Sequence, residues 1–107
     1  AERLRRLVLG RIPTTPEFAI GTSIWLAYEA KSVDDPVVAE LVQQGHAGGV
    51  QEAAALLDEC GVADAPTVAL RLMALAEGLA IRVLVGGLGS RAAIDLLEDL
   101  IAETLPG

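Results

Sequence analysis

The chain contains few of the side chains from which most catalytic and metal sites are built. Its 107 residues include one cysteine, one histidine and three aromatic residues. Cys60 alone cannot form a disulfide within the chain, and Cys60 with His46 is too small a set for a structural zinc site. No nucleophile stands beside a base in a pattern typical of covalent catalysis. We therefore expect no enzymatic activity, no metal and no cofactor.

The single cysteine also bears on the compartment in which the protein works. A chain without a disulfide is typical of a reducing compartment, and no signal peptide is visible. Residues 67–89 are hydrophobic, but Arg71, Glu77 and Arg82 are spaced through them. Each charge would cost about 2.5–3.5 kcal/mol at the centre of a bilayer. We therefore expect a cytoplasmic protein that does not enter a membrane.

Basic residues are scarce, and half of them lie at one end of the chain. Residues 1–11 hold four of the eight basic residues and one acid, a net charge of +3, whereas residues 12–107 carry a net charge of −10. The four arginines form either a basic arm or the solvated first turns of a helix. The acidic remainder should repel a phosphate backbone. We therefore predict that this segment makes no contact with DNA.

Hydrophobic residues, chiefly alanine, leucine and valine, make up 52% of the chain, a composition that favours helices. Capping residues, helix-starting prolines and helix-ending glycines divide the sequence into segments. Thr15, Asp35, Asp64 and Ser90 are the expected N-caps. The sequence predicts an all-α, antiparallel bundle of about five helices that forms one domain over residues 1–107. The predicted helices cover residues 2–9, 16–32, 36–60, 65–86 and 91–105.

The segment 65–86 is apolar almost all round, which is typical of a helix buried on several sides. A chain of 107 residues has too little surface to enclose such a helix alone. A second copy of the chain would supply the missing cover, so we predict a homodimer.

All three aromatic residues lie on the predicted helix 16–32. Phe18, Trp25 and Tyr28 fall within an arc of about 80° on its helical wheel. Gly45 and Gly49 occupy the inner face of the next helix, which runs to residue 60 and is either continuous or broken at these glycines. Small residues opposite aromatic ones leave room for an apolar guest. The alternative is a close helix crossing, for which glycine is also typical.

Three further residues complete the candidate pocket. Met73 and Glu77 of the long helix would close one side. Glu77 has apolar neighbours and no partner within its helix, so it is either a polar anchor for a ligand or paired with an arginine across a helix interface. His46, at the edge of the inner face, is either a ligand contact or a partly buried structural residue.

The order of these motifs resembles the C-terminal domain of tetracycline-repressor-like (TetR-family) transcriptional regulators. The resemblance rests on the Trp25 helix before an Asp-Asp-Pro turn, on the ending Asp-Glu-Cys-Gly of the third helix, and on the segment Leu75–Arg82 before a last amphipathic helix. It covers nearly all of the chain. Where many relatives have aspartate before the glycine, this chain has Glu77.

The resemblance implies an all-helical domain that binds a small-molecule effector and dimerises. Its last two helices, here residues 65–86 and 91–105, would pair with their copies in a four-helix bundle. A helix-turn-helix domain that reads DNA would lie upstream, with residues 1–9 as the end of the connecting helix. The expected interface residues are Leu72, Leu75, Leu79, Val83, Ala93, Leu97, Leu100 and Ile101.

We therefore expect the effector-sensing and dimerisation domain of a TetR-like repressor. Its ligand would be a mostly apolar small molecule held by Phe18, Trp25, Tyr28, Gly45, His46, Gly49, Met73 and Glu77. The alternative is a purely structural helical dimerisation module that binds no ligand.

Overall fold

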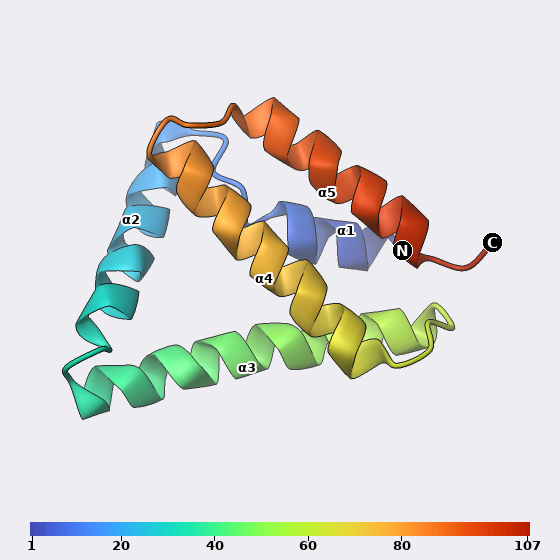
Figure 1. Ribbon diagram of the computed structural model, residues 1–107, viewed down its shortest axis with the longest axis horizontal. Helices are drawn as coiled ribbons and strands as arrows, with labels where there is room; N and C mark the ends of the chain where they lie inside the picture. The colour runs from blue at the N-terminus through green and yellow to red at the C-terminus, as the bar shows by residue number, and fades with distance from the viewer.

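The computed structural model describes residues 1–107 and consists of five helices (Figure 1). They are α1 (Glu2–Leu9), α2 (Pro16–Lys31), α3 (Pro36–Glu59), α4 (Ala65–Leu84) and α5 (Ser90–Thr104). The predicted all-α class and the predicted order of helices are confirmed, and each helix end lies within two residues of its expected position. None of the five helices combines the length and the apolar character that a crossing of the bilayer would need.

Two of the four expected N-caps form. The Thr15 hydroxyl accepts a hydrogen bond from the Phe18 N–H at 3.2 Å, and the Asp35 carboxylate accepts one from the Val37 N–H at 3.0 Å. Asp64 instead adopts a left-handed conformation with φ 54° and ψ 47°, and its side chain makes no cap bond. Ser90 is the first residue of α5, and Gly89 holds the cap position before it. Asp64 thus stands at the predicted N-cap position of α4 without making the cap bond, and the prediction of Ser90 as the cap of α5 was wrong by one residue.

Helix α3 runs without a break through Gly45 and Gly49. Each glycine lowers helix stability by about 1 kcal/mol relative to alanine. Packing of α3 against α4, which is the most extensive contact between any two helices, offsets this loss. Of the two alternatives for the third helix, continuous or broken at these glycines, the structure shows the continuous one.

The hydrophobic core lies between α1, α3, α4 and α5. Its largest fully buried side chains include Leu4, Leu57, Leu72, Met73 and Leu97. The core packs α1 against α3, α4 and α5, so the first helix is an integral part of the fold. Two ion pairs between exposed side chains join it to the same helices: Arg3 pairs with Glu59 of α3 at 2.6 Å, and Arg5 pairs with Glu98 of α5.

Helix α2 contributes no residue to this core. In Figure 1 it stands at one end of the molecule, next to the start of α3. It packs on α3 and α4 through one face only, and on its outer face Ile20 and Ile24 are 61% and 54% exposed. No other helix covers this outer face, so α2 is enclosed on one side only within the single chain.

Five of the eight residues expected at a dimer interface belong to the core of the single chain. Each is at most 7% exposed, and none is available to a partner: Leu72, Leu79, Ala93, Leu97 and Ile101. This corrects the interface prediction. The physical reason is that α1 and α3 pack on α4, and α1 and α4 pack on α5, so a partner can reach only the outer faces. Leu75 remains 40% exposed, and Val83 and Leu100 are half-buried.

Candidate functional site

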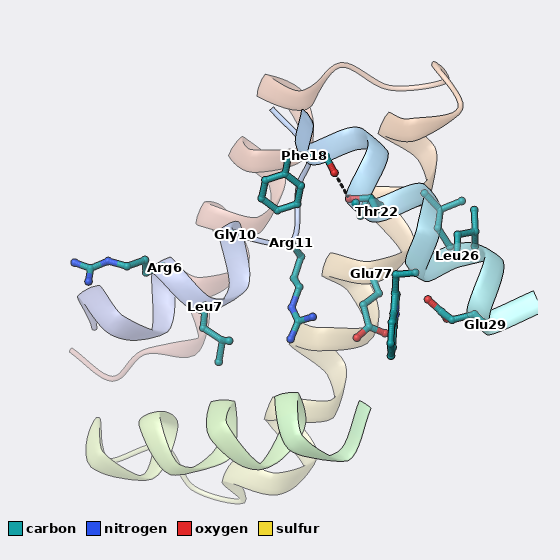
Figure 2. A pocket seen from close by; sticks show the side chains of 13 residues that line it. Arg6, Leu7, Gly10, Arg11, Phe18, Thr22, Leu26, Glu29 and Glu77 are labelled. Carbon is teal, nitrogen blue, oxygen red and sulfur yellow. Dashed lines mark hydrogen bonds between the residues drawn. The ribbon is translucent and has the colours of Figure 1, made fainter. Parts of the chain in front are cut away.

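A pocket of about 410 Å³ opens between α1, α2 and α4 (Figure 2). Its apolar walls come from all three helices, and four charged side chains lie among them. The lining residues are Arg6 and Leu7 of α1, Gly10 and Arg11 of the turn that follows it, Phe18, Gly21, Thr22, Trp25, Leu26 and Glu29 of α2, and Glu77, Ala80 and Ile81 of α4.

One stripe of α2 forms a whole wall of this pocket. Phe18, Thr22, Trp25 and Glu29 follow one another at intervals of three and four residues, which places them on one side of the helix. The Thr15 cap fixes where the helix begins. The Thr22 hydroxyl then donates to the Phe18 carbonyl at 3.1 Å, which satisfies the hydroxyl within the helix and leaves the wall mainly apolar (Figure 2).

The pocket brings together three of the eight predicted ligand-binding residues: Phe18, Trp25 and Glu77. The other five do not line it. Tyr28 lies on another side of α2 and is 49% exposed, whereas Met73 is buried in the core. The pocket lies on the α1 side of α2, and the prediction had placed it on the α3 side.

Side chains fill the space that had been expected opposite the α3 glycines. A Cβ atom built on Gly45 would lie 2.7 Å from Cη2 of Trp25. One built on Gly49 would lie 2.8 Å from Nη2 of Arg11 and 3.4 Å from Cε of Met73. At both positions the structure shows close packing, which was the stated alternative, and it contradicts a cavity between α2 and α3.

His46 of α3 stands behind the acidic part of the pocket wall. Its Nε2 lies 3.5 Å from Oε2 of Glu29 and 3.9 Å from Oε2 of Glu77. Nε2 is itself buried and makes no hydrogen bond. The ring meets Trp25 edge to face, with ring centroids 6.0 Å apart. Glu77 therefore faces a histidine of α3, and not the arginine that the alternative had proposed as its partner.

Residues 1–106 match the family described as BetI-type transcriptional repressor, C-terminal. The chain belongs to this family. No curated protein and no solved structure matches the chain. The match confirms the resemblance to TetR-like regulators, and it makes this chain a domain of a transcriptional repressor.

The four arginines at the start of this BetI-type domain fall into two pairs with different contacts. Arg3 and Arg5 bind acidic residues of α3 and α5, and the hydrogen bond from Arg5 to Glu98 raises the pKa of the Arg5 guanidinium. Arg6 and Arg11 line the pocket. The four arginines thus do not form one basic arm.

Sequence reasoning did not name ten of the thirteen residues that line this BetI-type site, among them Arg11. Arg11 lies in a loop, so helical periodicity gave no information about its direction. The spacing of Arg6 and Gly10, one helical turn apart, is the only sequence signal that could have placed the α1 side of the wall. No cluster of three or more histidine, cysteine, aspartate or glutamate side chains offers a site for a metal ion.

Proposed function

We propose that this domain senses a mostly apolar small molecule in the pocket between α1, α2 and α4. The observation that carries the proposal is a pocket of about 410 Å³ with walls from Leu7, Phe18, Trp25 and Ile81. Small-molecule sites in proteins typically have volumes of about 300–1,000 Å³ and mainly apolar linings with a few polar groups. The family supports the same function, since TetR-like regulators typically respond to small-molecule effectors.

The domain would also hold the repressor together as a homodimer. The outer faces of α4 and α5 offer Leu75 and Leu96, which are 40% and 51% exposed, beside the half-buried Leu100. Arg71 and Arg82 are exposed on α4, and Asp99 and Glu103 are exposed on α5. A two-fold axis would bring each α4 close to the partner's helices, so opposite charges could meet around an apolar centre. The DNA-reading domain would lie upstream, and this segment would make no contact with DNA.

Gly21→Leu tests the pocket. Gly21 lines the pocket, and a Cβ atom built on it has no heavy atom within 4 Å. A leucine at this position should therefore fill the pocket without disturbing the fold. Gly48→Leu is the matched control, because Gly48 has equally open surroundings on α3 and lies outside the pocket.

Trp25 is the only tryptophan, so its fluorescence reports on the pocket wall directly. A series of neutral apolar probes, such as straight-chain alcohols, should change this fluorescence in the native chain and in Gly48→Leu. The same probes should have little effect in Gly21→Leu. Equal responses in all three chains, or no response in any, would refute the pocket and leave the ligand-free dimerisation module.

A further inference from the structure

We propose that the pocket takes an amphipathic carboxylate, with its apolar body between the aromatic side chains and its carboxylate on the guanidinium of Arg11. This inference rests on the proposed function, because it names the chemical class of the molecule that the same pocket binds. Three observations carry it: the pairing of the charged groups, the position of Arg11, and the glycine beneath its guanidinium.

Arg11 is the one arginine of the pocket lining that has no carboxylate within 4.0 Å. Arg6 has the Glu2 carboxylate at 4.0 Å, and Glu29 and Glu77 both face His46. No acidic oxygen lies within 4.0 Å of the Arg11 guanidinium, and Arg11 donates no side-chain hydrogen bond. A half-buried guanidinium gains most from a ligand that supplies the missing negative charge.

The loop after α1 holds Arg11 in place. The Arg11 N–H donates to the Val8 carbonyl at 3.2 Å, and the next N–H, of Ile12, donates to the Leu9 carbonyl at 3.1 Å. The Ile12 side chain is 1% exposed and anchors the loop in the core. Figure 2 shows the Arg11 side chain extending from this anchored backbone into the pocket, between Leu7 and Glu77.

Gly49 provides the space in which the Arg11 guanidinium lies. A Cβ atom at residue 49 would be 2.8 Å from Nη2 of Arg11, so any side chain there would displace the guanidinium. This explains a glycine in the middle of a long helix, where glycine is otherwise unfavourable. The planar guanidinium can bind a carboxylate through two parallel hydrogen bonds, and the anchored backbone of Arg11 reduces the conformational entropy that this binding costs.

The remaining pocket surface suits a hydrocarbon body. Phe18 and Trp25 provide flat apolar walls on α2, and Leu7 and Ile81 face them from α1 and α4. The carboxylates of Glu29 and Glu77 lie at the His46 side of the pocket, where they would repel a second negative charge. The ligand should therefore carry a single carboxylate at one end.

Three probes of equal chain length test this assignment: octanoate, 1-octanol and octylammonium. We expect octanoate to bind the 107-residue chain about tenfold more tightly than 1-octanol, and octylammonium to bind least tightly, as measured by Trp25 fluorescence and by calorimetry. Arg11→Gln should reduce octanoate binding to the level of 1-octanol. Arg6→Gln is the control, since Arg6 lines the same pocket but is exposed and faces Glu2, and it should change octanoate binding less than threefold.

Gly49→Ala gives an independent test that leaves Arg11 intact. The new methyl group meets only the mobile end of Arg11 and the Met73 methyl group, so the fold should persist, as a thermal melt can verify. Octanoate binding should fall severalfold, and 1-octanol binding should not change. Tighter binding of octylammonium than of octanoate, or octanoate binding that survives Arg11→Gln, would overturn the inference and leave the pocket as a sensor of another ligand. Failure of all three probes to bind would overturn both proposals.

Discussion

Trp25 of α2 lies directly against Gly45 of α3. The ring atoms Cη2 and Cζ2 of Trp25 lie 2.7 and 3.2 Å from the position that a Cβ atom of residue 45 would occupy. The indole thus occupies the space that the absent side chain leaves. This contact positions α2, which has no buried residue of its own, and it orients Trp25 so that part of the ring also faces the pocket.

We predict that Gly45→Ala destabilises the fold relative to Gly48→Ala. Both changes introduce the same methyl group into α3, so both gain the same helix propensity of about 1 kcal/mol. Residue 48 has open space, whereas at residue 45 a rigid ring must move. The free energies of unfolding of the two variants should differ by about 1–3 kcal/mol, the usual penalty of overpacking. Urea denaturation monitored by circular dichroism measures this difference, and equal stabilities would contradict the contact.

The helices could be predicted from the sequence because their signals are local. The Thr15 and Asp35 caps each act on N–H groups two or three residues further on, and the prolines at residues 16 and 36 begin their helices. Asp64 shows the limit of such signals. It has the residue type of a cap, but the loop that joins α3 to α4 places it in a left-handed conformation.

The pocket could be predicted only in part, because its position depends on which side chains fill the spaces between helices. The aromatic face of α2 and the glycines of α3 were both recognised. Whether they enclose a cavity depends on the Trp25 rotamer and on Arg11, whose loop position carries no periodic signal. The sequence therefore indicated residues of the correct wall and placed the cavity on the wrong side of that wall.

The residues of the dimer face could not be predicted from the sequence for the same reason, as two neighbouring leucines of α5 show. Leu96 and Leu97 follow each other on an amphipathic helix, and either one suits a core or an interface by periodicity. Leu97 is completely buried within the chain, whereas Leu96 is 51% exposed. Only the positions of α1 and α4, the two helices that pack on α5, decide between the two roles.

We predict opposite effects of a charge at these two positions. Leu97→Glu places a charge among core residues and should abolish the cooperative thermal transition, since an unpaired buried charge is one of the most destabilising changes known. Leu96→Glu should leave the helical content and the thermal transition of the chain largely intact. It should shift the chain from dimer to monomer in sedimentation at micromolar concentration. A folded Leu96→Glu variant that remains dimeric would show that the two copies meet through another face.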